Sequence, residues 1–501
     1  MCTICQTFRP IDTGSCDYAQ SDPSQATAVS STTTTTSWNG LPVFTLDQIA
    51  YQLTDGYHLA TGSAPRSYDL FKLGNTISYN VSYLTTAGQT LAKAALQAWS
   101  EVTGIRFVQS TATNVGMMFD DNQAGAFAMS SFSGSTIVTS AVNISAAWLT
   151  SYGTAIGSYA FQTYLHEIGH ALGLGHAGNY NGGADYLTDA LYANDSWQAT
   201  LMSYFSQSEN GYVADTMAYV VTPMTADIVA IQNLYGTGAT ARTTGTVYGD
   251  GQTAGNGIYS LAGNVALTLF DTGGTDTINL ASRSQSQRLD LRPATVSDIN
   301  GYTGTLSIAR GTLIENARTG IGNDSVTGNG AANAVWAGGG QDTIRGLGGN
   351  DQLFGESGND QIWAGGGADT AYGGAGADRL WGEAGADRLF GDAGTDALYG
   401  GDGADTLTGG LGNDTLGGGI GSDVFVFADG FGSDRVVDFD VADTAERIDV
   451  SAVTAVADWA DLLTNHMTQS GADTVIDTGG GNVIVLAGVS LATLTAGDFA
   501  F

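Results

Sequence analysis

The sequence predicts two kinds of folded region, an α+β domain over residues 38–236 and an all-β parallel solenoid after it. Strand-like alternation and helix-like periodicity are mixed up to about residue 236, which is typical of an α+β domain. Helical patterns largely end there, and a nine-residue repeat becomes regular from about residue 319. The chain has 501 residues, which is enough for two or three domains with sizeable cores.

Charge and composition exclude several classes of partner and fold. The chain has 16 Lys and Arg against 49 Asp and Glu, a net charge of −33, so nucleic acid and anionic lipid would be repelled. No long apolar run occurs, and we therefore expect no stable membrane insertion. A hydrophobic content of 43% is too high for a disordered acidic chain. The 72 Gly and only 6 Pro exclude collagen and indicate a backbone that turns often.

Residues 1–37 are polar and rich in Ser and Thr, which indicates an N-terminal tail or prosegment. All three cysteines, Cys2, Cys5 and Cys16, lie in this stretch, so no later domain can contain a disulfide. Their role stays open, and no surrounding motif supports the alternative that one of them caps a metal ion in a latent form. The chain does not begin with a basic segment followed by an apolar one. We therefore expect either a cytosolic protein or export through another signal.

Residues 38–236 contain the patterns of a mixed domain. The alternating segment 76–83 predicts a half-buried strand, and residues 90–102 have the spacing of an amphipathic helix. Further strands are expected at residues 105–109, 115–119 and 126–130, and further helices at residues 160–172 and 223–234. This mixture of strands with a few long helices predicts the α+β class.

Residues 237–427 are expected to form the solenoid, with short strands joined by turns before the regular repeat begins. Asp recurs at every ninth position of the repeat except one, where Asn333 stands instead. The recurring residues are Asp324, Asp342, Asp351, Asp360, Asp369, Asp378, Asp387, Asp396, Asp405, Asp414 and Asp423. An apolar residue stands two positions after each of these, so a turn and an inward side chain recur together. Residues 428–501 are expected to form a C-terminal β region.

The repeat predicts calcium binding. Each unit suits a half-turn of a parallel β-solenoid, in which glycines let carbonyls point inward and Asp adds charge to that oxygen cage. Roughly six to eight oxygens at this spacing suit Ca²⁺ better than Zn²⁺ or Mg²⁺. Residues 319–427 carry 13 Asp and 2 Glu against 3 Arg, so several structural calcium ions are expected to hold these like charges together. The alternative, a solvated linker rich in Gly and Asp, does not explain the strict period.

A second motif, the segment HEIGHALGLGH, predicts a catalytic zinc site. His166 and His170 are four apart on a predicted helix, so their imidazoles project from one face and can hold one ion. Glu167 lies beside that face, where it can take a proton from a metal-bound water without being a ligand. Gly173 can adopt the left-handed conformation that ends the helix, and His176 then arrives as the third ligand. Three His and an open fourth position are typical of a catalytic site.

This motif resembles the HExxHxxGxxH signature of the metzincin metalloproteases. Downstream, the segment TLMSY resembles that clan's Met-turn, which implies Met202 as an apolar floor beneath the zinc. A Met followed two residues later by Tyr is similar to the serralysins, in which this Tyr, here Tyr204, is an additional zinc ligand and an oxyanion stabiliser. Taken alone, Tyr204 is more typical of a buried aromatic residue, and the upstream motif favours the functional role.

The repeats resemble those of the repeats-in-toxin (RTX) family, whose loops bind Ca²⁺ in a parallel β-roll. Units such as GLGGNDQLF and GGDGADTLT carry this resemblance. It implies export from a Gram-negative bacterium through the type I secretion apparatus, followed by folding in extracellular calcium. Residues 498–501 look like the C-terminal export signal of such proteins. Two further segments resemble the additional calcium site of the serralysins, which implies Asp271, Asp276 and Glu315 as calcium ligands.

Together the resemblances imply an α+β metzincin-type zinc protease domain followed by an all-β RTX β-roll. The expected function is a secreted zinc-dependent endopeptidase stabilised by calcium, with Glu167 as general base and Tyr204 stabilising the oxyanion. Protein or peptide substrates are expected to pair through their backbone with an edge strand at residues 124–129, which favours broad specificity. We expect a monomer.

Two departures from the serralysin pattern and two alternative functions stay open. Ala177 stands where serralysins usually have Pro, and Gly245 stands where an acidic calcium ligand is expected. One alternative is a calcium-dependent surface or adhesive RTX protein whose protease module is inert. The other is an enzyme with one narrow target, such as its own prosegment.

Overall fold

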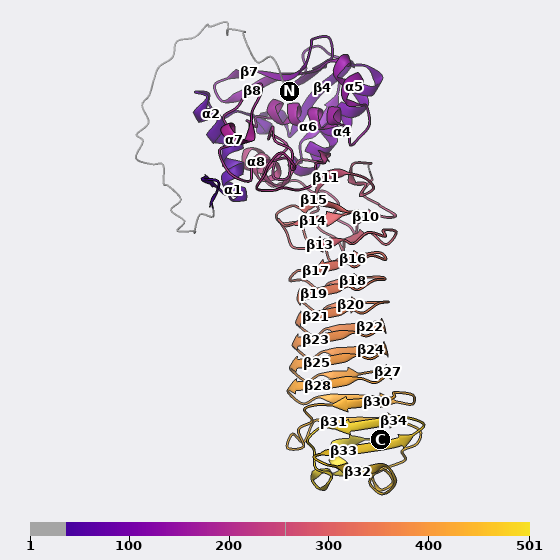
Figure 1. The fold of residues 1–501 in the computed structure, drawn as a ribbon. Coiled ribbons are helices and arrows are strands. Elements are labelled where there is room, and N and C mark those ends of the chain that lie inside the picture. The colour runs from indigo at the N-terminus through magenta and orange to yellow at the C-terminus, as the bar shows by residue number, and fades with distance from the viewer. Residues whose placement is uncertain (1–36, 256) are drawn as a thin grey trace. The chain divides into compact units, whose positions relative to one another are not determined.

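The computed structural model of the protein describes residues 37–255 and 257–501 (Figure 1). Residues 1–36 of the predicted tail, with Cys2, Cys5 and Cys16, lie outside the described residues. The chain divides into two compact units, Met1–Ala239 and Thr240–Phe501, and each is described by itself. Among the described residues, no helix is both long enough and apolar enough to cross a membrane.

The first unit combines helices with a mixed sheet, which confirms the predicted α+β class. Its helical segments are α1 (Leu46–Tyr51), the π-helical η2 (Gln52–Gly56), α2 (Tyr57–Ala60), α3 (Leu70–Leu73), α4 (Thr86–Thr103), α5 (Ala146–Tyr152), α6 (Tyr159–Ala171), α7 (Tyr186–Asp189) and α8 (Thr225–Tyr235). Its strands are β1 (Ser37–Trp38), β2 (Leu41–Pro42), β3 (Ser67–Tyr68), β4 (Thr76–Tyr83), β5 (Arg106–Gln109), β6 (Met117–Asp120), β7 (Ala126–Ser133), β8 (Thr136–Ile144) and β9 (Tyr219–Val220).

The main sheet of this unit places an edge strand beside the helix that carries the zinc motif. Its strand order is β3-β8-β6-β4-β5, and these strands pair in parallel. Strand β7 pairs antiparallel with β8 along its length and with no second strand among the described residues. Helix α6 contacts β7 and β8. An extended chain could therefore pair with the free edge of β7 next to α6.

Most predicted elements of the first unit form close to their predicted bounds. The strand predicted at residues 76–83 is β4, and the helices predicted at residues 160–172 and 223–234 are α6 and α8. Helix α4 begins earlier than predicted because the Thr85 side chain accepts a hydrogen bond from the backbone N–H of Gly88 and caps it. The sequence prediction misses several elements of this unit, of which β8 and α5 are the longest.

Helix α6 is fixed at both ends and along its buried face. The Ser158 hydroxyl caps its N-terminus by accepting a hydrogen bond from the N–H of Phe161. Along the helix, the buried Trp99 of α4 donates its indole N–H to the carbonyl of Leu165 at 3.0 Å. Beyond the helix, Gly173 has a φ of +106°, and a Cβ there would lie 2.0 Å from the carbonyl oxygen of Arg66. Only glycine fits this turn, which confirms the predicted left-handed end of the helix.

The second unit consists mainly of short strands. They are β10 (Val247–Gly249), β11 (Val265–Leu269), β12 (Thr277–Asn279), β13 (Arg288–Asp290), β14 (Val296–Ile299), β15 (Tyr302–Ile308), β16 (Asn316–Arg318), β17 (Ser325–Thr327), β18 (Ala334–Trp336), β19 (Thr343–Gly348), β20 (Gln352–Phe354), β21 (Gln361–Gly366), β22 (Thr370–Gly376), β23 (Arg379–Ala384), β24 (Arg388–Gly394), β25 (Ala397–Asp402), β26 (Thr406–Thr408), β27 (Leu411–Gly412), β28 (Thr415–Ile420), β29 (Val424–Ala428), β30 (Ser433–Val436), β31 (Arg447–Ala452), β32 (Met467–Ser470), β33 (Asp473–Gly479), β34 (Asn482–Leu486) and β35 (Phe499–Ala500). Its helical segments are η3 (Gly257–Tyr259), α9 (Trp459–Asp461), η4 (Leu462–His466), η5 (Leu491–Thr493) and η6 (Ala496–Asp498).

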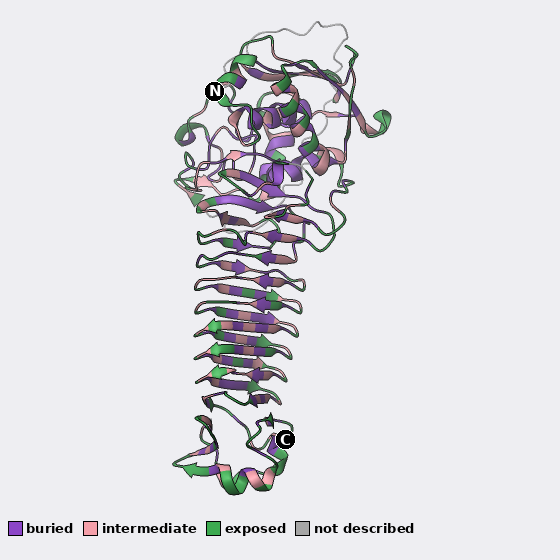
Figure 2. Cartoon of the chain, turned by 90° about the vertical axis from the view of Figure 1, so that its right-hand side faces the viewer, coloured by how far each residue is buried: buried purple, intermediate pink, exposed green. Residues whose placement is uncertain are grey.

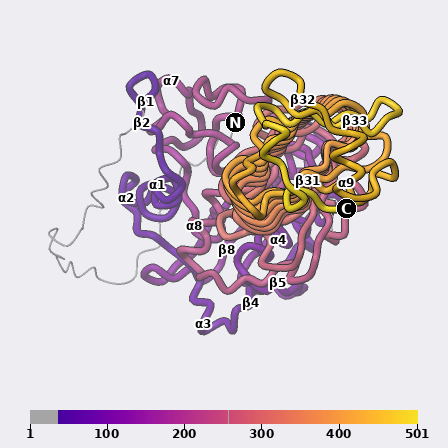
Figure 3. Tube along the Cα trace, turned by 90° about the horizontal axis from the view of Figure 1, so that it is seen from below, coloured from indigo at the N-terminus to yellow at the C-terminus, as the bar shows by residue number. Residues whose placement is uncertain are grey.

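The nine-residue units of the second unit form a parallel β-roll. Successive units alternate between two sheets, so residues 18 apart are neighbours, as Ile344 and Ile362 are. The coils overlie one another when the roll is seen along its stack (Figure 3). The apolar residue of each unit is fully buried, as Leu380 and Leu398 are, and buried positions recur along the rungs (Figure 2). This arrangement confirms the predicted all-β roll and the inward role of the apolar position.

Candidate metal centre

Three imidazoles converge at the end of α6. The ligand atoms of His166, His170 and His176 all lie within 4.8 Å of one another, and the Nε2 atoms of His170 and His176 are 3.0 Å apart. The Nδ1 atoms of His166 and His170 lie 2.9 and 2.8 Å from the carbonyl oxygens of Leu201 and Leu174. These bonds favour the tautomer that protonates Nδ1 and leaves Nε2 free to bind a metal ion.

Burial keeps the three imidazoles in the neutral form that binds metal. It lowers the pKa of His166 to about 4 and that of His170 to about 3, with His166 also repelling a proton on His170. Burial also lowers the pKa of His176 well below its ordinary value, and the two other imidazoles add to this effect. Neutral, preoriented nitrogens at this separation fit a single divalent transition metal such as zinc.

The third imidazole, that of His176, is held by a segment far away in the sequence. The backbone N–H of Gly175 donates to the carbonyl of Leu53 in η2 at 2.7 Å. The ring of Tyr57 meets His176 edge-on, with ring centroids 5.2 Å apart. A Cβ on Gly175 would clash with the Tyr57 ring at 2.4 Å. The turn after α6 and the η2–α2 segment therefore fix His176 together.

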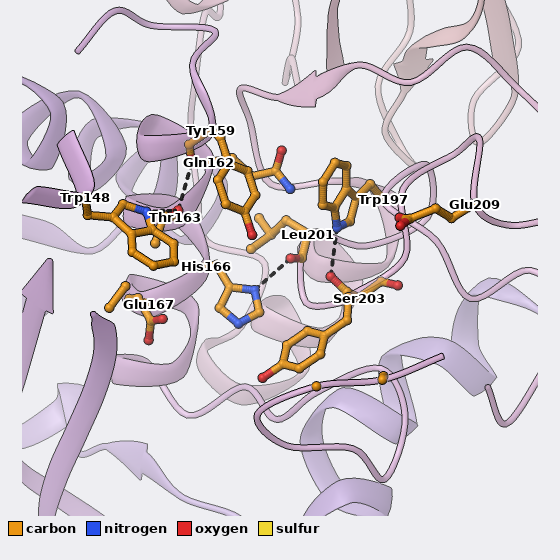
Figure 4. Close-up of a pocket in the computed structure, with 14 residues that line it drawn as sticks. Trp148, Tyr159, Gln162, Thr163, His166, Glu167, Trp197, Leu201, Ser203 and Glu209 are labelled. Carbon is orange, nitrogen blue, oxygen red and sulfur yellow. Dashed lines mark hydrogen bonds between the residues drawn. The ribbon is translucent and has the colours of Figure 1, made fainter. Parts of the chain in front are cut away.

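Glu167 follows the first ligand on α6 and lines the cavity beside it (Figure 4). Only 4% of Glu167 is exposed. Burial raises the pKa of its carboxyl to about 8, and a hydrogen bond from the backbone N–H of Ala128 opposes this shift. A carboxyl whose pKa lies near neutrality, close to a metal site, has the properties of a general acid–base.

A buried carboxylate that the sequence prediction misses supports the first ligand. Asp227 of α8 accepts hydrogen bonds from the Thr200 hydroxyl, from the N–H of Leu201 and from the N–H of Met224. Leu201 in turn offers its carbonyl to His166. Asp227 therefore fixes the peptide that orients His166. A polar residue in the first turn of the helix predicted at residues 223–234 is the only sign of this role in the sequence.

The segment TLMSY lies under and beside the three imidazoles. Met202 is fully buried, and its sulfur lies under α6, where a Cβ on Gly169 would come within 2.8 Å of it. Tyr204 is half-buried, and its ring centroid lies 4.7 Å from that of His176 and 6.1 Å from that of His166. The Tyr204 ring also packs on Tyr180 at 4.8 Å. The structure thus brings both predicted residues to the histidine cluster.

A cavity of about 340 Å³ opens beside this cluster. Figure 4 shows His166 and Glu167 on one side of it and aromatic side chains around it. Its lining residues are Ala126, Trp148, Tyr159, Gln162, Thr163, His166, Glu167, Gly183, Ala184, Trp197, Leu201, Ser203, Tyr204 and Glu209. The cavity therefore joins the metal centre to the edge strand β7, through Ala126.

The predicted calcium residues of the β-roll form two ladders. In each ladder, one carboxylate oxygen accepts a hydrogen bond from the backbone N–H of an Asp 18 residues earlier, as Asp360 does from Asp342 at 2.8 Å. The other oxygen is buried and has no hydrogen-bond partner among the described residues in Asp342, Asp351, Asp360, Asp369, Asp378, Asp387, Asp396, Asp405, Asp414 and Asp423. Buried, unpartnered carboxylate oxygens at regular spacing fit a row of bound cations.

The ladders differ from the predicted set at three positions. Asp434 continues one ladder, accepting from the N–H of Asp414 at 2.9 Å and leaving its second oxygen without a partner. The prediction misses it because its spacing from Asp414 is 20 residues. Asp324 begins the same ladder, but both of its oxygens accept backbone N–H groups, from Gln287 and Gly320. At the degenerate unit, the Asn333 amide donates to the carbonyl of Glu315 and closes the cage with hydrogen bonds.

The additional calcium site predicted from resemblance is only partly assembled. Asp276 and Glu315 are close, since Glu315 accepts a hydrogen bond from the Asp276 N–H at 2.7 Å, and one Asp276 oxygen is buried without a partner. Asp271 instead accepts from the Tyr248 hydroxyl at 2.6 Å and lies 3.7 Å from the Arg242 guanidinium. Protein groups thus already satisfy the Asp271 oxygen that faces Arg242.

Comparisons with known proteins agree with this geometry. Residues 74–182 match the Matrixin family model, and residues 237–478 match the model described as Peptidase M10 serralysin C terminal. Metallopeptidase AprA of Pseudomonas marginalis is 34% identical over 336 residues, which cover 59% of this chain and 68% of that protein. The chain belongs to the serralysin family of metalloproteases. Membership confirms the predicted class, a secreted zinc-dependent endopeptidase with an RTX β-roll, and does not favour the adhesive alternative.

Other serralysins align with this chain over a smaller share of their own length. Serralysin of Photorhabdus laumondii is 37% identical over 267 residues, covering 51% of this chain and 55% of that protein. Serralysin C of Dickeya chrysanthemi is 34% identical over 314 residues, covering 57% and 64%. The chain thus aligns with about half to two thirds of these relatives. Among solved structures, the extracellular lipase LipA of Serratia marcescens covers 50% of this chain and 46% of its own, with 16% identity and a TM-score of 0.20, too low to carry an argument.

Proposed function

We propose that His166, His170 and His176 hold one catalytic zinc ion and that Glu167 is the general base of peptide hydrolysis. The observation that carries this proposal is the convergence of three neutral imidazoles beside a buried carboxyl and an open cavity. Zinc bound there supplies Lewis acidity, which lowers the pKa of a water molecule and polarises the scissile carbonyl.

The residues around the three imidazoles have separate tasks. Glu167 takes a proton from the attacking water and delivers it to the leaving amine. Tyr204 donates its hydroxyl to the oxyanion that develops on the scissile carbonyl, for which its half-buried ring beside His176 is well placed. Met202 forms the floor beneath the imidazoles, and Asp227 fixes the orientation of His166 through the Leu201 peptide. Neither residue touches substrate.

Protein and peptide substrates bind in extended form along the free edge of β7. The strand offers backbone N–H and C=O groups next to Glu167, whose carboxyl already accepts the N–H of Ala128. Backbone pairing depends little on the side chains of the substrate, so many sequences are accepted. This position of the substrate makes the protein an endopeptidase of broad specificity. The proposed active form is the monomer.

Calcium ions occupy the two ladders and couple folding of the β-roll to the medium. The unpartnered buried oxygens of the ladders are the support for this proposal. Without cations the stacked carboxylates repel one another, so the roll is much less stable where calcium is scarce. This behaviour suits export through a type I secretion apparatus of a Gram-negative bacterium and folding outside the cell.

The test of the enzymatic proposal is hydrolysis of a protein substrate by the full chain and its Glu167→Ala variant. We expect the variant to retain zinc and a native circular dichroism spectrum but to lose activity by at least about a thousandfold, because the general base is absent. Equal cleavage by the two proteins would overturn the role of Glu167. A wild-type protein that binds zinc but cleaves no protein would overturn the endopeptidase function.

A further inference from the structure

Two cavities lie on opposite sides of the histidine cluster along strand β7. The first, described above, is lined by Ala126, His166 and Glu167. The second has a volume of about 190 Å³ and is lined by Ala128 and Ser130 of the same strand. Strand β7 therefore runs from the first cavity to the second, over about 13 Å for its four residue steps. A substrate strand paired with β7 would pass both cavities, one on each side of the bond to be cleaved.

The first cavity suits a long side chain with a positive end. Its walls include the rings of Trp148 and Trp197, whose indole N–H groups are already used, on the Thr163 hydroxyl and on the Ser203 carbonyl (Figure 4). These walls therefore offer apolar ring faces, on which an aliphatic stem or a cation can pack.

The first cavity also presents a carboxylate that pairs with no Lys or Arg of the described residues. Glu209 lines it, and one of its oxygens is fixed by the N–H and hydroxyl of Ser206, at 2.9 and 2.7 Å. Within the described part of the chain, no Lys or Arg forms an ion pair with Glu209. The fixed carboxylate is thus available to a basic group of the substrate.

The second cavity has the opposite charge. Arg66 lines it, and its guanidinium lies 3.5 Å from the ring centroid of Phe132. Arg66 has no Asp or Glu partner among the residues that the structure describes. The cavity also contains His58, whose two ring nitrogens lie within hydrogen-bond distance of the Ser63 hydroxyl and the Gly173 carbonyl. Arg66 is therefore the permanent charge that the second cavity offers to a substrate.

We propose that these two charges select substrates with an acidic side chain on the amino-terminal side of the scissile bond and Lys or Arg on its carboxyl-terminal side. The proposal rests on the proposed function, in which substrate pairs with β7. Antiparallel pairing is the more stable kind, and it places the amino-terminal part of the substrate near Ser130 and the carboxyl-terminal part near Ala126. Arg66 then meets the acidic side chain, and Glu209 meets the basic one.

The acidic preference is the more diagnostic half of this proposal. The net charge of −33 attracts any basic peptide to the protein, so a general preference for Lys and Arg could arise without a specific contact. The same field repels acidic peptides. A preference for Glu near the scissile bond therefore needs a local cation, and Arg66 is the cationic side chain that the second cavity provides. Because the proposed zinc ion is present in every variant, a preference that depends on Arg66 separates the two cations.

The test compares matched peptides with the full-length enzyme. One pair differs by Lys against Gln on the carboxyl-terminal side of the cleaved bond, and the other by Glu against Gln on the amino-terminal side, with the bond identified by mass spectrometry. We expect kcat/KM to favour the charged member of each pair by about twofold to fivefold, the range of partly exposed ion pairs. Glu209→Gln should abolish the first preference only, and Arg66→Gln the second only. Arg66→Glu should invert the second preference.

Each preference is the ratio of two kcat/KM values measured with the same enzyme preparation. A variant that has lost part of its folded or metal-loaded fraction loses it for both peptides, so the ratio is unaffected. Preferences that are absent in the wild type, or unchanged in both variants, would overturn the polarised cleft while leaving the protease function intact. A wild-type enzyme that cleaves neither the charged nor the neutral peptides would instead overturn the proposed function itself.

Discussion

Asp227 shows how one buried residue can control a metal centre that it does not touch. Its carboxylate binds the N–H of Leu201 at 2.8 Å, and the Leu201 carbonyl binds His166 at 2.9 Å. Burial raises the pKa of Asp227 to about 7, and its three hydrogen bonds oppose that shift. Burying this carboxyl is costly, and the hydrogen bonds that offset the cost fix the peptide behind His166.

The first prediction concerns the Asp227→Asn variant. An amide cannot accept from all three donors as a carboxylate does, so the Leu201 peptide shifts and His166 loses its fixed orientation. We expect zinc affinity to fall by about tenfold to a hundredfold, which competition with a chelator would measure. The matched control is Asp215→Asn, which removes a carboxylate whose partner is Gln198. Equal zinc affinity in wild type and Asp227→Asn would contradict this chain of contacts.

At the scale of elements, the zinc site depends on how α6 ends. The helix places His166 and His170 on one face with Glu167 beside that face, and the turn at Gly173 returns the chain so that His176 joins them. The Arg66 carbonyl, which belongs to a distant segment, packs against that turn. A local backbone conformation and a tertiary contact thus determine together where the third ligand lies.

The second prediction concerns Gly173→Ala. A Cβ at this position would lie 2.0 Å from the Arg66 carbonyl oxygen, in backbone that must keep a φ of +106°. We expect the variant to lose zinc affinity at least about tenfold, since His176 must move, and to unfold at a lower denaturant concentration. The control is Gly62→Ala, because Gly62 also has a positive φ but nothing within 4 Å of its Cβ position. Similar zinc affinities for the two variants would show that the turn does not place His176.

Local patterns in the sequence predict these elements well, and contacts between distant segments are what they miss. The spacing of His166, His170 and Gly173 is complete within one helix and its end, so α6 and its role follow from periodicity. The partner of Leu201 lies 26 residues away in α8, and no pattern connects Asp227 to it. In the roll, the strict nine-residue period predicts the ladders. The period misses Asp434, because an insertion makes its separation from Asp414 20 residues.

At the scale of the whole molecule, the two separately described units suit two different kinds of cation. The three neutral imidazoles of the first unit suit one zinc ion, whereas the carboxylate ladders of the second suit calcium. Burial raises the pKa of Asp342 and Asp351 to about 7 and of Asp387 and Asp405 to about 6, with neighbouring carboxylates adding to the shift in all four. Charging the ladders without cations is therefore costly.

The third prediction is a pH dependence that calcium removes. An Asp in the unfolded chain has a pKa near about 3.9, so between about pH 4 and pH 7 the folded roll holds protons that the unfolded chain has lost. In chelator, stability should therefore fall as pH rises through this range. We expect the Tm of the β-sheet circular dichroism signal in chelator to be higher at about pH 5 than at about pH 7.5.

Calcium should change the direction of that dependence. Bound cations favour ionised carboxylates, so in calcium the Tm should be at least as high at about pH 7.5 as at about pH 5. A Tm in chelator that rises with pH over the same range would contradict the assignment of the buried ladder carboxyls. A roll that is equally stable with and without calcium at neutral pH would contradict cation-coupled folding.

The central claim is that three imidazoles of one helix and its following turn hold a single catalytic zinc ion. Its most direct test is the zinc content of the purified, calcium-loaded full chain, measured by elemental analysis beside the His170→Gln variant. We predict about one zinc per chain in the wild type and a loss of nearly all zinc in the variant, with calcium content unchanged. A wild-type chain that holds no transition metal, or a variant that keeps it, would contradict the account.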